Sequence, residues 1–220
     1  MSLDFTLYDV TVRLTEDLLG TVPKSKEVYA AYIAAKGREM IARQDKKTGN
    51  RLADGSPSTD ANVTTALAEE VETIEEVEEK GWTGFHQDSE GPFLFNYAIK
   101  GFLCESARTL KERGGVKQLQ DKVKRYLFVV PRRIRLSGIR PDPLERPLRG
   151  WTAQGPRVTL ARSDVVPEGT EVSFRIKILD GGGLKLAILR DILEYGGCIG
   201  LGQWRTGGYG SFELVSIEEV

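Results

Sequence analysis

The sequence contains few of the residues from which metal or disulfide sites are built. Its 220 residues include two cysteines, Cys104 and Cys198, and a single histidine, His86. The cysteines lie far apart and neither belongs to a CxxC pair, which excludes zinc fingers and histidine-rich metal sites. We therefore expect no metal and no other cofactor. So few cysteines in a chain of this length fit a reducing compartment.

Long apolar segments are missing as well. No run of eighteen apolar residues occurs, so the sequence predicts no membrane span. The first residues, MSLDFTLYDV, have neither the basic stretch nor the apolar core of a signal peptide. We therefore expect a cytoplasmic protein without a membrane partner. Hydrophobic residues make up 40% of the chain, which is ordinary for a globular domain that needs no disulfides to form a core.

The net charge of −1 conceals a polarised distribution of charge. Residues 54–90 hold eleven acidic residues and one basic residue, whereas residues 108–149 hold thirteen basic and four acidic residues. This separation suggests an anionic partner, or self-association in which the acidic part of one copy binds the basic part of another. Two independently solvated faces would produce the same pattern.

The amino-terminal half predicts one strand followed by three helices. Residues 3–14 alternate between apolar and polar with one phase slip, which indicates a strand with a β-bulge near Tyr8. Helices are expected over 25–43 and about 60–80, with a polar loop between them. A third helix is expected over 96–113, with its buried stripe formed by Ile99, Leu103, Ala107 and Leu110.

The carboxyl-terminal half contains the clearest pattern. Pro131 predicts an edge or a bend in the strand-like segment 126–136, and residues 137–156 are rich in proline and glycine and are expected to be irregular. Residues 171–179 alternate without error and predict a half-buried strand, with Val172, Phe174, Ile176 and Ile178 on one side. A helix over 184–195, with Tyr195 on its buried stripe and Gly196-Gly197 at its end, precedes a last strand through Phe212, Leu214 and Ile217.

This order of elements predicts an α+β fold. A strand, a helix and a strand within the last third of the chain form a split β-α-β unit of the ferredoxin-like or RRM-like kind. No second hydrophobic pattern requires its own core. We expect a single domain over 1–220, with an inserted loop and acidic helix at about 44–92.

A glycine-rich segment precedes the last strand. Seven of the fifteen residues in GGCIGLGQWRTGGYG (196–210) are glycine, and Trp204, Arg205 and Tyr209 lie among them. Stacking rings and a guanidinium among accessible amides can hold a sugar-phosphate backbone and its bases. The segment lacks the Gly-Lys-Ser/Thr of a phosphate-binding loop, and it runs from helix to strand, which excludes a dinucleotide fingerprint. The alternative is a glycine-rich hairpin into which Trp204 and Tyr209 simply pack.

The chain resembles the RAMP superfamily, the RNA-binding subunits of CRISPR effector complexes. The resemblance rests on the glycine-rich loop GLGQWRTGGYGSFEL (200–214) with the helix before it, on VVPEGTEVSFRIKI (165–178), and on YAIKGFLCESAR (97–108). Ala98 departs from the family pattern, which usually has serine two residues before the lysine. Residues 140–165 resemble phage-borne proteins more than a CRISPR component, which is consistent with a divergent or phage-borne relative.

The resemblance implies which residues face RNA. These are Lys100 and Gly101 in the internal segment, and Gly200, Gly202, Arg205, Gly207, Gly208 and Gly210 in the glycine-rich loop. The residue types add Trp204 and Tyr209 as stacking partners. They also add Arg132, Arg133 and Arg135, which on an edge strand would present alternating charge to phosphates. A row of solvated arginines that guards an exposed edge is the alternative.

The function expected from these features is binding of single-stranded RNA by a non-catalytic RAMP-like subunit of a CRISPR-type ribonucleoprotein in antiviral defence. One alternative is a metal-independent endoribonuclease with His86, expected in a loop, as its catalytic residue. Asp54 and Asp60 cannot be aligned with the cutting aspartate of the family. Another alternative is a phage-borne protein-interaction module that kept the fold.

Overall fold

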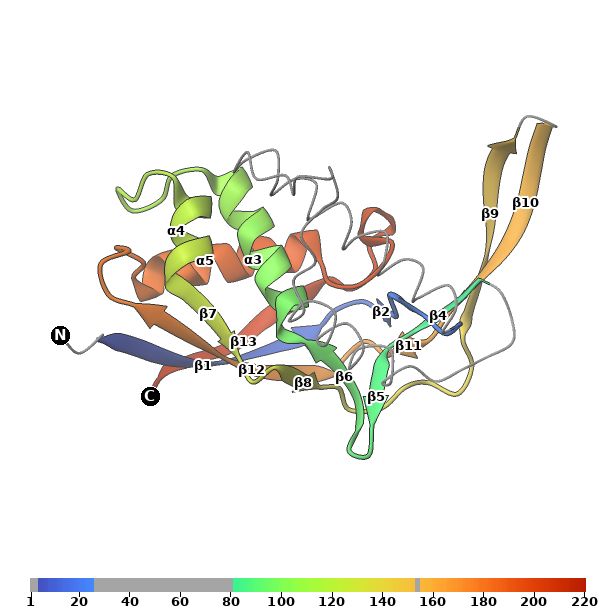
Figure 1. The fold of residues 1–220 in the computed structure, drawn as a ribbon, viewed down its shortest axis with the longest axis horizontal. Helices are drawn as coiled ribbons and strands as arrows, with labels where there is room; N and C mark the ends of the chain where they lie inside the picture. The colour runs from blue at the N-terminus through green and yellow to red at the C-terminus, as the bar shows by residue number, and fades with distance from the viewer. Residues whose placement is uncertain (1–3, 26–80, 153–154) are drawn as a thin grey trace, which may run out of the picture.

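The computed structural model describes residues 4–25, 81–152 and 155–220 (Figure 1). The helices expected over 25–43 and 60–80, the loop between them, Asp54 and Asp60 lie outside the described residues, except for Ser25. The strands are β1 (Phe5–Leu14), β2 (Leu18–Leu19), β3 (Val22–Pro23), β4 (Trp82–Gly84), β5 (His86–Asp88), β6 (Gly91–Phe95), β7 (Leu127–Val130), β8 (Arg133–Arg135), β9 (Leu144–Thr152), β10 (Gly155–Ser163), β11 (Val165–Val166), β12 (Glu171–Leu179) and β13 (Phe212–Glu219). The helices are α3 (Asn96–Leu110), α4 (Leu119–Tyr126) and α5 (Leu186–Ile199), with the short 3₁₀ helix η1 (Arg205–Gly207).

The main sheet has four antiparallel strands in the order β13-β1-β12-β7. Helices α3, α4 and α5 lie over one face of this sheet (Figure 1). The period of two in β1 and β12 places every second side chain in the core beneath the helices, as the sequence predicts. The predicted α+β class is thereby confirmed. The pairing of β1 with β13 shifts between Thr11 and Val12, where Val215 of β13 has no partner in the register, while β1 pairs with β12 without a break; the predicted bulge near Tyr8 is wrong.

Helix α3 buries the face that its sequence predicts. Ile99, Leu103 and Ala107 are completely buried, and Leu110 packs against the same core. Helix α5 runs four residues beyond its predicted end. Tyr195, which was predicted to lie on the buried face of this helix, is 36% exposed, whereas Leu189 and Leu193 are buried. None of the described helices is both long and apolar enough to span a bilayer.

Gly196 and Gly197 lie inside α5 and do not end it, contrary to the prediction. A Cβ atom on Gly196 would lie 2.6 Å from the ring of Phe102 on α3. A Cβ atom on Gly197 would lie 2.1 Å from the carbonyl oxygen of Phe212 on β13. The two glycines therefore allow α5 to approach its neighbours closely.

The remaining strands form smaller sheets in the orders β3-β4-β10-β9, β5-β6-β8 and β11-β2. The chain changes from the main sheet to the second of these between β7 and β8, so Pro131 marks the bend that the sequence predicts. Residues 137–156 were expected to be irregular, and instead they supply β9 and the start of β10, a hairpin that extends away from the helices (Figure 1). Strand β9 is an edge strand, and an edge tolerates proline because one side of its backbone is not hydrogen-bonded.

His86 lies in strand β5 and not in the loop predicted for it. Its side chain is 3% exposed, and its ring packs against Phe93 and Phe95 with centroid separations of 5.6 and 4.6 Å. Burial, assisted by the nearby charge of Arg133, lowers the pKa of His86 to about 4. The imidazole is therefore a neutral member of the core at neutral pH, and a substrate does not reach it.

The buried histidine makes stability depend on pH. The unfolded chain binds a proton at His86 below pH 6.5, whereas the folded chain binds it only below about pH 4, so stability is full above pH 6.5 and falls as the pH drops between these values. The shift corresponds to about 3 kcal/mol. We expect His86→Leu to remove that part of the pH dependence in urea unfolding at pH 7 and pH 4. Equal pH dependence in both proteins would contradict the buried position of the ring.

Candidate nucleic-acid interface

The glycine-rich loop connects α5 to β13 and closes on its own backbone. The N–H of Leu201 donates to the carbonyl oxygen of Gly210 over 2.8 Å, and the side chain of Leu201 is buried. A Cβ atom on Gly210 would lie 2.0 Å from the Leu201 carbonyl oxygen, and one on Gly202 would lie 2.6 Å from that of Leu19. Both glycines also have positive φ angles, of 72° and 75°. These positions are glycine because the chain approaches itself there.

The loop glycines therefore divide into two groups. Gly200, Gly202 and Gly210 lie against the backbone of this chain, which is a structural role. Gly207 and Gly208 are exposed, and an added Cβ atom on Gly208 would meet nothing within 4 Å. Among the glycines of this loop that were expected to face RNA, Gly207 and Gly208 are the two that are exposed.

Two aromatic side chains of the loop form a stacked pair at the surface. The ring centroids of Trp204 and Tyr209 are 5.1 Å apart and their planes differ by 16°. Trp204 is 44% exposed and Tyr209 is half-buried, so the two rings pack against each other at the surface. A Cβ atom on Gly207 would lie 2.8 Å from the indole, which shows how closely the loop backbone supports this ring. Exposed aromatic rings that their neighbours hold in place can contribute to a stack with a nucleobase.

A guanidinium from the hairpin packs against this pair. The Cζ atom of Arg146 on β9 lies 4.5 Å from the centroid of the Trp204 ring, which is a cation–π distance. Arg146 itself is 8% exposed. The sequence did not single out this residue, because the segment that carries it was expected to be irregular.

Arg205, predicted to face RNA, forms an ion pair within the protein. Its Nη1 atom lies 2.8 Å from a carboxylate oxygen of Glu105 on α3, and about a third of each side chain is exposed. The pair connects η1 to α3. The positive charge that Arg205 offers to a phosphate is correspondingly reduced.

Lys100 lies in a different part of the structure. Its ammonium donates to the carbonyl oxygen of Val123 over 2.6 Å and to that of Leu127, at the carboxyl end of α4. Burial lowers the pKa of Lys100. Lys100 and Leu127 line a hollow of about 220 Å³ that contains no residue of the glycine-rich loop. Gly101, its neighbour, is exposed on α3 with open space around it.

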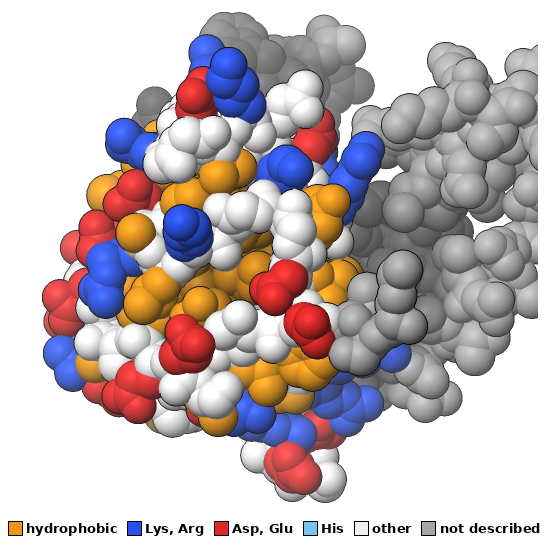
Figure 2. Space-filling model, turned by 90° about the vertical axis from the view of Figure 1, so that its left-hand side faces the viewer, with side chains coloured by type: hydrophobic (Ala, Val, Ile, Leu, Met, Phe, Trp, Pro, Cys, Tyr) orange, Lys and Arg blue, Asp and Glu red, His pale blue; other side chains and the backbone are white. Residues whose placement is uncertain are grey.

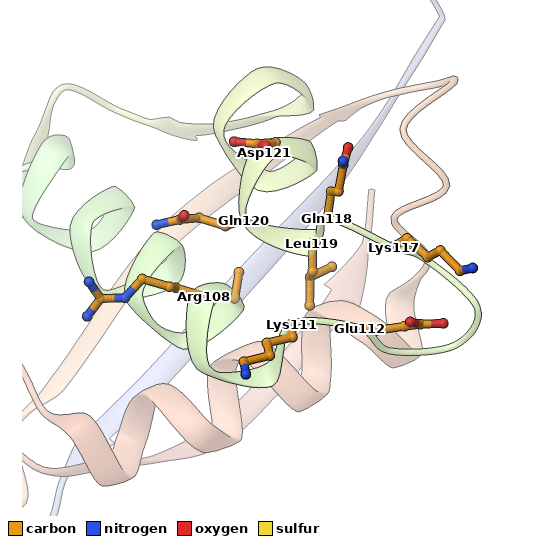
Figure 3. A pocket seen from close by; sticks show the side chains of 9 residues that line it. Arg108, Lys111, Glu112, Lys117, Gln118, Leu119, Gln120 and Asp121 are labelled. Atoms are coloured by element: carbon orange, nitrogen blue, oxygen red, sulfur yellow. The ribbon is translucent and has the colours of Figure 1, made fainter.

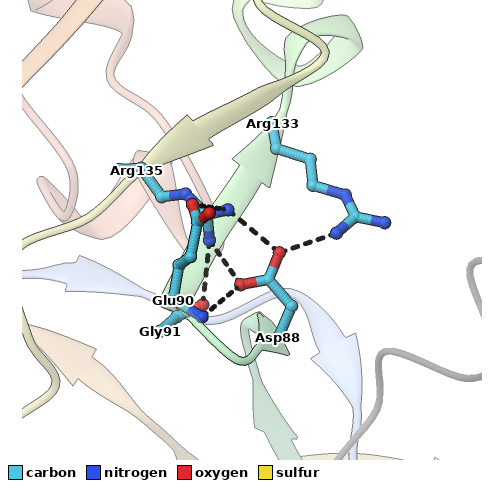
Figure 4. A network of polar contacts seen from close by, with 5 residues as sticks. All are labelled: Asp88, Glu90, Gly91, Arg133 and Arg135. Carbon is cyan, nitrogen blue, oxygen red and sulfur yellow. Dashed lines mark hydrogen bonds and ion pairs between the residues drawn. The ribbon is translucent and has the colours of Figure 1, made fainter.

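Of the predicted row of arginines, Arg133 and Arg135 lie on β8, which is an edge strand, as expected, and Arg132 lies just before it. Arg133 and Arg135 bind the Asp88 carboxylate over 2.7 and 2.5 Å, and Arg135 also pairs with Glu90 (Figure 4). Hydrogen bonds from Arg135, with a further one from Arg133, hold the pKa of Asp88 well below its usual range. The guanidinium of Arg132 lies over the ring of Phe95 at 5.6 Å. Carboxylates of this chain thus already neutralise much of the charge of the row.

A hollow of about 580 Å³ lies beside the loop, bounded by Gly207, Gly208 and Tyr209. Its opposite wall is formed by Glu16, Asp17, Arg140, Pro167 and Glu168. Among the described residues that line the hollow, Arg140 is the single basic one. Asp17 accepts hydrogen bonds from Arg140 and from the N–H of Glu168, each over 3.1 Å. Carboxylates repel phosphates and accept hydrogen bonds from hydroxyl and amino groups, so this hollow suits the ribose or base side of a nucleotide.

A second hollow, of about 430 Å³, lies between the end of α3 and the start of α4. Arg108, Lys111 and Lys117 line it, but their side chains point in different directions and alternate with Glu112 and Asp121 (Figure 3). On the face shown in Figure 2, acidic and basic side chains are likewise interspersed, with hydrophobic side chains between them. Neither view shows basic groups that converge on one point.

Comparisons with known proteins give matches among solved structures but not among family models or curated sequences. No model of a protein family matches the chain, and no curated protein matches it. Among solved structures, a chain in the cryo-EM structure of the type III-B Cmr-beta complex bound to cognate target RNA is similar, with 12% sequence identity and a TM-score of 0.48. The alignment covers 98% of this chain and 61% of that chain, so this chain spans less than two thirds of its neighbour's length.

The packing of the loop glycines predicts opposite effects for two Gly→Ala changes. Gly210→Ala places a methyl group on the Leu201 carbonyl at a positive φ angle, so we expect a loss of more than about 2 kcal/mol in the free energy of unfolding. Gly101→Ala, in open space within α3, should stabilise the protein by about 0.5–1 kcal/mol. Urea unfolding of both variants measures this, and a neutral Gly210→Ala would contradict the closed loop.

Proposed function

We propose that this protein binds single-stranded RNA on its glycine-rich loop, as a RAMP-like subunit of a ribonucleoprotein. The observation that carries the proposal is the stacked pair of Trp204, which is exposed, and Tyr209, which is half-buried, on a loop whose backbone is fixed by close contacts. The hollow beside Tyr209 offers room for the nucleotide next to the stacked base. The loop is also the segment on which the resemblance to the RAMP superfamily rests.

The strand order supports a ferredoxin-like core for this subunit. Helix α3 lies in the connection from β1 to β7, helix α5 connects β12 to β13, and the four strands lie in the order β13-β1-β12-β7. Two interleaved β-α-β units in one antiparallel sheet have this arrangement. We therefore propose a single domain over 1–220, with the insertion at about 44–92, in a non-catalytic, cytoplasmic subunit of a CRISPR-type assembly.

The arrangement of charge suggests that stacking contributes more than phosphate contacts. Arg205, Arg133 and Arg135 are paired with carboxylates of this chain. Base–aromatic stacking contributes about 1–3 kcal/mol per base and tolerates any sequence. Binding that relies on stacking loses less affinity with added salt than binding that relies on phosphates.

The endoribonuclease alternative loses its catalytic candidate. His86 is 3% exposed and lies between aromatic rings of β6, away from any surface where a ribose hydroxyl could approach it. General acid–base catalysis needs a group within hydrogen-bond reach of the substrate. The protein-interaction module is an outcome that the binding experiment below distinguishes.

The binding experiment compares two exposed aromatic residues. We expect Trp204→Ala to weaken binding of a short unstructured RNA at least about tenfold, because one stacking face is lost. Tyr195→Ala, which removes a ring that is 36% exposed on α5, is the matched control and should leave the affinity unchanged. Fluorescence anisotropy at two salt concentrations measures both affinities.

The possible results separate the functions. Equal binding by wild type and Trp204→Ala would show that RNA lies elsewhere and would overturn the proposal. A wild-type protein that binds no RNA and purifies without nucleic acid would favour a protein-interaction module.

A further inference from the structure

Arg146 differs from the other buried cation in the described part of the chain. Lys24 is 7% exposed and lies 2.9 Å from the Asp164 carboxylate. Arg146 is 8% exposed, and among the described residues neither its Nε nor its Nη1 atom has a hydrogen-bond partner. A guanidinium that is removed from water without an anion is costly to the folded state. The observation therefore raises the question of which anion completes the site.

The contact that Arg146 does make leaves two of its buried donor atoms, Nε and Nη1, without a hydrogen-bond partner among the described residues. The guanidinium carbon lies 4.5 Å from the centroid of the Trp204 ring, which is a cation–π contact and supplies no hydrogen-bond acceptor to Nε or Nη1. The five N–H bonds of a guanidinium lie in one plane. This planar set of donors matches the oxygens of a phosphate group.

The position of Arg146 places these donors beside the proposed stacking surface. Arg146 is on β9, opposite Ala161 of β10, and its neighbour Trp204 is 44% exposed. The guanidinium thus lies next to a side chain that is partly open to solvent. A nucleotide that stacks on Trp204 or Tyr209 brings its phosphate to this region, because base and phosphate are joined through one ribose.

We propose that Arg146 anchors a phosphate-binding site next to the Trp204–Tyr209 pair. The phosphate supplies the acceptors that the Nε and Nη1 atoms of Arg146 lack. Because both atoms are buried, a neighbouring side chain has to move for the phosphate to reach them. That the phosphate belongs to a single strand of RNA rests on the proposed function. The anion site itself stands on the burial and the missing partners of Arg146, and a free nucleotide would bring the same chemistry.

The first test uses inorganic phosphate as the probe. We expect the melting temperature of the wild type to rise when sodium chloride is replaced by sodium phosphate at equal ionic strength, beyond the general effect of phosphate on any protein. Arg13→Met, which removes an exposed arginine of the main sheet, is the control for that general effect and should keep the whole rise. Arg146→Met should lose the rise in melting temperature that exceeds the general effect of phosphate. Its melting temperature in sodium chloride should equal or exceed that of the wild type.

A purely structural role for Arg146 gives the reverse result. Arg146→Met would then be less stable in chloride and would respond to phosphate as Arg13→Met does, and this outcome would overturn the proposal. Arg146→Lys serves where the methionine variant does not fold, because it keeps the charge. We expect it to lose most of the phosphate response, since an ammonium lacks the planar set of donors. A full response in the lysine variant would likewise contradict the site.

The second test separates this proposal from the proposed function. Binding of a uridine oligonucleotide and of uridine monophosphate is measured for the wild type and Arg146→Met, with an expected loss of at least about tenfold for the oligonucleotide. If the variant binds the oligonucleotide as the wild type does, the Arg146 site fails while RNA binding stands. If no RNA binds but the monophosphate does so through Arg146, RNA binding fails and the phosphate site stands.

Discussion

The hydrogen bond from the Leu201 N–H to the Gly210 carbonyl closes the loop on which the functional interpretation depends. It forms only because Gly210 has no side chain, since a Cβ atom there would overlap the Leu201 carbonyl oxygen at 2.0 Å. Gly202 permits a similar approach to the backbone of Leu19, and Gly207 permits one to the Trp204 indole. The glycines therefore fix the backbone and leave Trp204 exposed and Tyr209 half-buried at the surface. A more open loop would lose the ordered aromatic pair that can receive a base.

The distribution of charge around this loop follows a consistent pattern. Arg205 is paired with Glu105, and Arg133 and Arg135 share Asp88. Arg146 is the exception within the described residues of this region, because its guanidinium is buried against an aromatic ring without a hydrogen-bond partner on Nε or Nη1. Three of the arginines in the described part of this region are thus paired with carboxylates, and the proposed phosphate site rests on the one guanidinium that is buried without such a pair.

The sequence predicts correctly the strands and helices whose apolar residues recur with a regular spacing, because burial of one face is the cause of that spacing. The alternation over 171–179 and the spacing of Ile99, Leu103 and Ala107 reflect burial on one face, and the structure has both elements. A glycine pair in a helical pattern has two possible roles, since Gly196-Gly197 could end the helix or allow close packing within it. The contacts with Phe102 and Phe212 show that close packing is the role here. The burial of His86 depends on the pairing of β5 with β6, which brings the rings of Phe93 and Phe95 against it, and the burial of Arg146 depends on the β9–β10 hairpin, which the prolines of the segment do not indicate. Neither environment follows from the hydrophobic pattern alone.

The position of the bound strand is the most direct test of the account. Ultraviolet crosslinking of RNA that contains 4-thiouridine, followed by mass spectrometry of tryptic peptides, identifies the residues that the bases touch. We expect crosslinks to concentrate in the peptides that meet at Arg205, one ending with Trp204-Arg205 and the other containing Tyr209. Crosslinks confined to other peptides, such as those around Lys100 or Arg132, would contradict the role of the glycine-rich loop.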